Sequence, residues 1–253
     1  MRRFFIIFFA SVVTLAATAQ SDNYFYRDIT CRARLGYSIG GNAPMPMPAT
    51  IRSLNSFKLQ PNISFGADIY KPLRGGKWGL QFGIQFENKG MHTDADVKNY
   101  NMEMTRESQS IEGWFTGKVD TQVKQGMFTF HLQGVYNISP KVRLRLGPYL
   151  SYLTQRQFKG YAYHGYLRTG DPTGTKVEIG DDEESRGLYD FSEHMKKTQL
   201  GVDIGADWLF ANRVGAYADL AWGITGTFEK DFKTIEQKLY PIYGTIGVFY
   251  VIR

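Results

Sequence analysis

A strict alternation of apolar and polar residues is the clearest pattern in the chain, and it is strongest between residues 197 and 226. Two runs there carry apolar side chains on the even positions and mainly glycine, aspartate and tyrosine on the odd ones. Period-two alternation predicts β-strands with one apolar and one polar face. The apolar face includes Trp208, Phe210 and Trp222, whereas the other face carries carboxylates. That combination is typical of transmembrane barrel strands, with lipid outside, a polar interior and aromatic residues at the interfaces.

The same alternation recurs in six further segments, at residues 31–40, 60–70, 77–87, 126–138, 142–154 and 239–253. Together with the two runs above, these segments predict an all-β fold, an eight-stranded antiparallel up-and-down transmembrane β-barrel. Long connections alternate with short ones, and outer-membrane barrels place the long ones outside the cell and the short ones in the periplasm. The long polar segments 88–125 and 155–196 are therefore interpreted as extracellular loops. The second should extend its hairpin beyond the membrane, because residues 170–174 form a turn sequence.

The first residues of the chain have the features of an export signal. Arg2 and Arg3 precede an apolar run that ends in a small-residue cleavage sequence, Ala17-Thr18-Ala19. The run is too short for a membrane-spanning helix, so residues 1–19 are predicted to be a cleaved secretory signal peptide. Residues 20–29 would then be a short periplasmic leader, and residues 30–253 a single barrel domain in the outer membrane.

Composition narrows the classes of protein that fit this pattern. The chain has 253 residues and a formal net charge of +6, and its basic residues do not cluster among stacking aromatics, so nucleic acid is not an expected partner. Cys31 is the single cysteine and cannot form an intramolecular disulfide. A soluble lipocalin-type barrel is the main structural alternative, but it would place the Trp and Phe face inside and the Asp and Arg residues outside.

Charged residues on the polar face are the candidate interior network. They are Arg34, Asp68, Glu87, His131, Arg143, Arg145, Asp203, Asp207 and Asp219. An eight-stranded barrel has just enough internal space for side chains, so these groups are expected to pair in a packed core rather than to line an ion path. The role assigned to them is therefore structural.

The sequence does not contain the combination of residues that a barrel enzyme would need. His92, His131, His164 and His194 are scattered, and lipid hydrolysis would require a His, a Ser and a carboxylate together near the outer leaflet. The acidic run 181–184 lacks the ligand spacing of a calcium loop. We therefore predict no catalytic residue, no cofactor and no metal.

Several short motifs resemble the PorT-like outer-membrane β-barrel family. They are residues 146–150 (Leu-Gly-Pro-Tyr-Leu), 189–192 with Lys196 and Lys197, 200–206 and 247–250. The resemblance extends over essentially the whole chain after the signal. It implies an outer-membrane barrel without catalytic residues, and it implies a role in a protein-secretion apparatus as one function.

Two classes of function follow from these features. The first is a non-enzymatic outer-membrane barrel with a packed polar interior, acting as a structural or partner-binding protein. Its partners would be outer-membrane lipid and lipopolysaccharide, and a protein bound through the extracellular loops or the periplasmic turns. The alternative is a barrel enzyme acting on lipid A, or a small pore. Loss of a co-purified partner on loop deletion would support the first class, and a change in lipid A mass would support a barrel enzyme.

Overall fold

The computed structural model describes residues 28–106, 109–232, 234–235 and 238–252. The predicted signal peptide and most of the predicted leader lie outside these residues. The described chain forms eleven strands: β1 (Thr30–Pro44), β2 (Ile51–Lys58), β3 (Ile63–Pro72), β4 (Trp78–Arg106), β5 (Gln109–Asn137), β6 (Val142–Thr169), β7 (Lys176–Ile179), β8 (Gly187–Asp190), β9 (Thr198–Leu209), β10 (Val214–Gly223) and β11 (Leu239–Val251). Within the described residues, no helix has the length and apolar character needed to cross a membrane.

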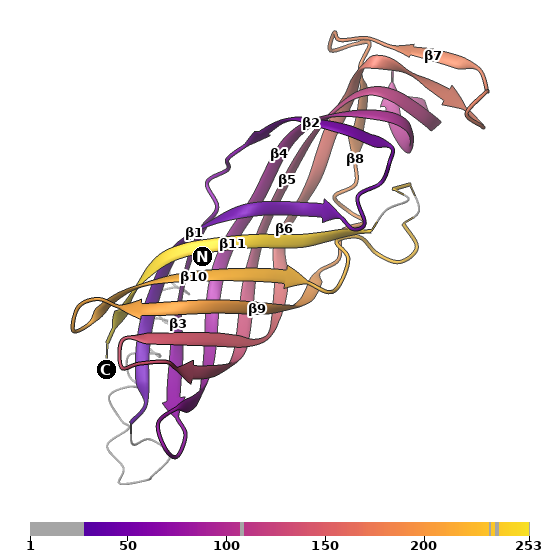
Figure 1. The fold of residues 1–253 in the computed structure, drawn as a ribbon. Coiled ribbons are helices and arrows are strands. Elements are labelled where there is room, and N and C mark those ends of the chain that lie inside the picture. The colour runs from indigo at the N-terminus through magenta and orange to yellow at the C-terminus, as the bar shows by residue number, and fades with distance from the viewer. Residues whose placement is uncertain (1–27, 107–108, 233, 236–237, 253) are drawn as a thin grey trace, which may run out of the picture.

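Strand pairing closes a ring. β1 pairs with β3, and the pairing continues through β4, β5, β6, β9, β10 and β11, each antiparallel to its neighbours. The closing pair is β1 with β11, in register from Arg32 opposite Val251 to Pro44 opposite Leu239. Figure 1 shows these strands wrapping around the lower part of the molecule. The all-β, antiparallel prediction is confirmed.

The prediction of eight strands joined by long loops needs correction. Three of the eleven described strands, β2, β7 and β8, lie outside the ring, and the ring itself is uneven. β4 and β5 are 29 residues long and β6 is 28, whereas β9 has 12 residues and β10 has 10. Most of the segments interpreted as loops, 88–125 and 155–196, are therefore strand. The three long strands continue past the ring as an extension of the sheet (Figure 1).

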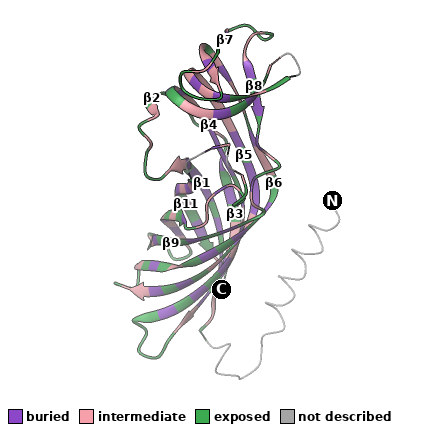
Figure 2. Ribbon diagram, turned by 90° about the vertical axis from the view of Figure 1, so that its right-hand side faces the viewer, coloured by how far each residue is buried: buried purple, intermediate pink, exposed green. Residues whose placement is uncertain are grey.

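Within the ring, the apolar face of each strand points outward. Exposed side chains form a band around it, made of Leu35, Ile39, Phe65, Ile69, Leu80, Phe82, Phe130, Leu132, Leu146, Leu150, Val202, Ile204, Leu220, Ile246 and Val248. The buried side chains of the same strands are mostly polar, among them Arg32, Arg34, Asp68, Gln81, Glu87, Gln133, Arg145, Asp203 and Asp207. The alternation of buried and exposed positions is visible along the ring strands in Figure 2. This arrangement is the reverse of a soluble barrel.

The outward band has the dimensions of a membrane. From Leu144 to Tyr152, a strand rising about 3.3 Å per residue and tilted by about 40° climbs roughly 20 Å, and the stagger of its neighbours extends the band towards 25 Å. Aromatic rings lie at the end of the band near the short turns, where the ring centroids of Trp78 and Tyr136 are 4.8 Å apart. Trp208 and Phe210 form a second such pair at 5.7 Å. Aromatic residues of this kind mark the edge of the hydrocarbon layer.

Beyond the band, the two faces of β4, β5 and β6 exchange character. Inward positions, polar in the ring, become apolar and form a buried cluster of Met91, Val97, Met102, Met104, Phe115, Val123, Phe158, Ala162, Leu167, Ile179, Tyr189, Phe191, Met195, Ile235 and Leu239. Outward positions become polar: on β4, Phe86 is followed at the next outward positions by Asn88, Gly90, His92 and Asp94. The apolar face turns away from the outside, as expected where strands leave lipid and enter water.

The extension encloses this second core because β8 bridges its two edges. β8 pairs with β6 from Lys159 opposite Asp190 to Ala162 opposite Gly187, and with β4 where Thr105 lies opposite Leu188. The sheet therefore curls over the cluster instead of remaining flat. Phenylalanine rings pack against one another there, with Phe158 and Phe228 edge to face and their ring centroids 5.0 Å apart.

The lipid-facing assignment predicts a large effect at Ile204, which lies in the middle of β9 and is 53% exposed. Ile204→Arg should destabilise the folded protein by about 2–4 kcal/mol, because an arginine near mid-membrane must be desolvated. Leu188→Arg is the matched control, since Leu188 is 45% exposed but lies on the extension. Urea unfolding from lipid vesicles measures both changes. Equal effects of the two substitutions would contradict the assignment.

Candidate functional site

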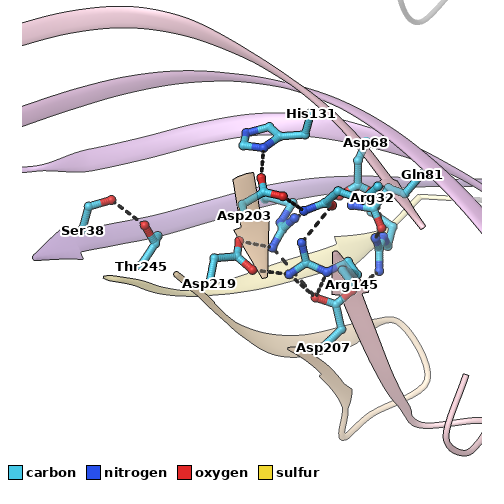
Figure 3. A network of polar contacts seen from close by, with 12 residues as sticks. Arg32, Ser38, Asp68, Gln81, His131, Arg145, Asp203, Asp207, Asp219 and Thr245 are labelled. Carbon is cyan, nitrogen blue, oxygen red and sulfur yellow. Dashed lines mark hydrogen bonds and ion pairs between the residues drawn. The ribbon is translucent and has the colours of Figure 1, made fainter. Parts of the chain in front are cut away.

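The interior of the ring contains a layer of ion pairs built around arginines (Figure 3). On β1, the Arg32 Nε donates to Asp68 Oδ1 at 2.6 Å, and its Nη1 donates to Asp207 Oδ2 at 2.7 Å. The remaining nitrogen donates to Gln81 on β4. One guanidinium thus connects β1 to β3, β4 and β9, and its side chain is 2% exposed.

Arg145 and Arg34 complete the layer. The Arg145 Nε donates to Asp207 at 3.0 Å, its Nη1 donates to Gln133 at 3.1 Å, and its Nη2 binds Asp219. Arg34 binds Asp219 at 3.0 Å through Nη2, and its Cζ lies 3.8 Å from the ring centroid of a tyrosine on β10. Carboxylates on three strands are therefore shared between arginines on two others.

The charges of this layer cancel. Three arginines face three aspartates, and the side chains of all but Asp219 are at most 4% exposed. A buried charge without a partner costs several kcal/mol, whereas well-hydrogen-bonded pairs recover that penalty. Gly205 is needed beside the layer, because a Cβ there would overlap the Asp219 carboxylate and approach the Arg145 guanidinium. The absence of a side chain at Gly205 thus leaves space for the ion pair of Arg145 with Asp219.

Two smaller polar groups lie beside and above the arginine layer. Asp203 accepts a hydrogen bond from Gln133 Nε2 at 2.7 Å and also contacts His131 Nδ1. Farther along the strands, Lys89 Nζ donates to Glu87 at 3.1 Å, and Thr129 also donates to that carboxylate. A small cavity, with room for about one water molecule, is lined by residues of both groups.

Apolar side chains follow the polar groups along the same inward faces. Met127 and Leu153 are the next inward residues after Thr129 and Ser151 in the direction of the extension, and each is at most 3% exposed. Val123 and Phe158 continue towards the core of the extension. The polar interior is thus covered by apolar packing on the side of the extension.

The structure brings most of the predicted interior residues together but separates Arg143 from the layer. Arg143 lies near the short-turn end, partly exposed, with its Cζ 4.3 Å from the ring centroid of Tyr70. The predicted network omitted Arg32 and Lys89, whereas the alternation had placed Gln81 and Gln133 on the polar face without making them part of the network. Arg32 has the same parity as Arg34, and Lys89 the same parity as Glu87, so extending the alternation by one step would have found both.

A separate polar group lies outside the ring, on the outer face of the extension. His92 Nε2 is 2.9 Å from Asp120 Oδ2 across the β4–β5 pair, and Asn55 on β2 donates to Asp94 at 2.9 Å. Tyr163 on β6 donates to the same Asp94 carboxylate. Burial, together with this hydrogen bond, raises the pKa of Tyr163, so the phenol stays neutral and remains a donor. Among the described residues, no group of three or more His, Cys, Asp or Glu side chains is arranged to hold a metal ion.

Comparison with known families agrees with this architecture. A family model described as outer membrane protein beta-barrel domain matches residues 18–229. The chain belongs to this outer-membrane β-barrel family. Membership also supports an outer-membrane location, in agreement with the outward apolar band. No curated protein matches the chain.

The solved structures that match this chain are only distantly similar to it. The attachment invasion locus protein Ail of Yersinia pestis is 10% identical, with a TM-score of 0.38, over 88% of this chain and 97% of that one. The transport unit of the autotransporter AIDA-I from Escherichia coli is 11% identical, with a TM-score of 0.19, over 96% of this chain and 97% of that one. Likenesses at this level do not bear on function.

The arginine layer predicts that Arg145, which belongs to it, contributes more to stability than Arg143, which lies outside it. Arg145→Ala should destabilise the folded protein by about 3–5 kcal/mol, because Asp207 and Asp219 would each lose a buried partner. Arg143→Ala removes a stacked arginine at the rim and should cost about 0.5–2 kcal/mol. Denaturant unfolding in vesicles compares the two variants. A loss for Arg145→Ala no larger than that for Arg143→Ala would contradict the network.

Proposed function

We propose that this protein is a non-enzymatic outer-membrane scaffold that presents a rigid β-sheet to a protein partner outside the cell. In this proposal the ring formed by β1, β3, β4, β5, β6, β9, β10 and β11 is an eight-stranded barrel that spans the membrane. The extension of β4, β5 and β6, closed by β8, is the binding platform. The interior network is structural and the lumen is closed to ions.

The exchange of faces along β4, β5 and β6 is the observation that carries this proposal. In the ring these strands carry their apolar side chains on the outer face, and in the extension they carry them on the inner face. This pattern suits a strand that is surrounded first by lipid and then by water. The extension has its own apolar core around Phe158 and Met104, so it keeps its shape without help from lipid. A sheet ordered in this way before binding loses little conformational entropy when a partner docks.

The positions at which β1 begins and β11 ends support the assignment of the extension to the outside. The first and last described strands begin and end at the side of the short turns, at Thr30 and Val251, while the extension lies on the opposite side. Outer-membrane barrels place their short turns in the periplasm. The resemblance of residues 146–150 and 200–206 to PorT-like barrels adds a component of a protein-secretion apparatus as a candidate partner.

The packing of side chains in the interior of the ring favours a scaffold function and argues against a pore. The arginine layer crosses the ring from β1 to β6 and β9, and the apolar residues Met127 and Leu153 lie above it. Both features fill an interior that eight strands leave narrow.

Co-purification with matched tyrosine variants tests the platform. Tyr161 lies on the outer face of the extension, with its ring centroid 5.5 Å from that of Tyr163, whereas Tyr152 belongs to the lipid-facing band. After cross-linking in native outer membranes, the unmodified chain should recover a protein partner. Tyr161→Ala should reduce that recovery at least tenfold and Tyr152→Ala should not, because aromatic residues dominate such interfaces. Equal recovery with both variants, or no partner at all, would contradict the proposal.

A further inference from the structure

The outer face of the sheet carries its charges in a definite order above the lipid-facing band. Phe86 on β4 and Phe128 on β5 are opposite each other, with ring centroids 5.3 Å apart, and they are among the last lipid-facing side chains of these strands. On β5, Lys124 lies four residues farther from the band than Phe128, on the same face, and it is exposed. Lys58, at the end of β2, is opposite His92 on β4 and is also exposed. One row, Asn88 with Gly126, separates the phenylalanines from Lys124, and Lys58 lies in the second row after that of Asn88.

Carboxylates occupy the next rows. Asp94 and Asp120 are opposite each other on β4 and β5, and Asp96 lies one row farther from the band. These acids are engaged with neighbours on the sheet: Asp120 with His92, Asp94 with Asn55 and Tyr163, and Asp96 with Ser53. In contrast, Lys58 and Lys124 form no ion pair with any residue that the structure describes. The lysines are thus available to an anion from outside the chain, and the carboxylates are not available to neutralise them.

The lysines lie just above the headgroup layer. Four residues along a strand tilted by about 40° rise roughly 10 Å to Lys124, and six residues rise roughly 15 Å to the row that contains Lys58, whereas the headgroup region extends about 5–8 Å beyond the hydrocarbon. A lysine chain can lie back along the sheet and place its ammonium group several ångströms lower. On β4, between Lys58 of β2 and Lys124 of β5, Gly90 is buried beside Gln60 and Asn62, and Asn62 holds the Gly90 backbone through hydrogen bonds of 2.7 and 3.0 Å.

We propose that Lys58 and Lys124 form a docking surface for the phosphate-bearing headgroups of the outer leaflet, and that the charge order above the band fixes how deep the barrel sits. The inference rests on the proposed membrane position of the ring. The lysines attract anionic headgroups, while Asp94, Asp96 and Asp120 repel them and keep the extension in water. The surface is continuous with the lipid-facing band, so the occupant is a membrane lipid and not a soluble anion.

Unfolding from vesicles of two compositions tests the surface. The mature chain is folded into phosphatidylcholine vesicles, and into the same vesicles with about one third phosphatidylglycerol as the anionic probe. At low salt the anionic lipid should raise the ratio of folded to unfolded protein for the unmodified chain. Lys58→Gln/Lys124→Gln should lose about 30-fold of that gain, since each lysine near an anionic surface contributes about fivefold. Salt near 1 M should abolish the difference.

Lys98→Gln/Lys118→Gln is the matched control, because it removes the same charge from β4 and β5 farther from the band. It should keep the gain, as should the charge-preserving Lys58→Arg/Lys124→Arg. An equal loss in both Gln variants would show a net-charge effect only and would overturn the proposal. So would failure of the Lys58→Gln/Lys124→Gln variant to fold in neutral vesicles, which would make these lysines structural. If the unmodified chain fails to insert into either vesicle, the membrane position itself is wrong.

Discussion

Closure of the ring is the constraint on which the rest of the structure depends. Lipid offers no hydrogen bonds, so every backbone group of a membrane-spanning strand must find its partner within the protein. The antiparallel pairing of β1 with β11 meets that demand from Arg32 opposite Val251 to Pro44 opposite Leu239, on the side of the ring where the strands are short. The interior of the closed ring is narrow, and its buried charged side chains must neutralise one another. The shared carboxylates of Asp207 and Asp219 are the result.

The three long strands β4, β5 and β6 extend from lipid into water, and their apolar side chains change from the outer face to the inner face between the two. On β5, the lipid-facing Phe130 and the exposed Lys124 lie on one side, while the buried polar Gln133 and the apolar Val123 lie on the other. The same backbone therefore forms a barrel with a polar interior and, farther along, a sheet over an apolar core. The extension continues β4, β5 and β6 without an intervening loop, with local register shifts in the pairing of β4 with β5 and of β5 with β6.

The alternation of residue types made the ring predictable, because lipid and a polar interior impose opposite demands on neighbouring positions. The interior residues followed from the same parity, as with Asp68 and Arg145. The extension was hidden because its outward face is polar and its inward face apolar, so residues 88–125 resemble a polar loop to any reasoning that expects lipid outside. Strand β2 was missed for a similar reason: six of its eight residues are exposed, and its pairing with β4 contains two register shifts. Long-range contacts such as that of His131 with Asp203 depend on the closed ring and have no local signal.

The most direct test of this account is a spin-label scan along the outer face of β5, in a Cys31→Ser background with single cysteines at Leu132, Phe130, Gln122 and Lys118. Accessibility to oxygen, which concentrates in lipid, is compared with accessibility to a water-soluble nickel chelate. The account predicts oxygen-dominated labels at Leu132 and Phe130 and chelate-dominated labels at Gln122 and Lys118, with the change between Phe130 and Gln122. Chelate access at Leu132, or oxygen-dominated labels as far as Lys118, would contradict it.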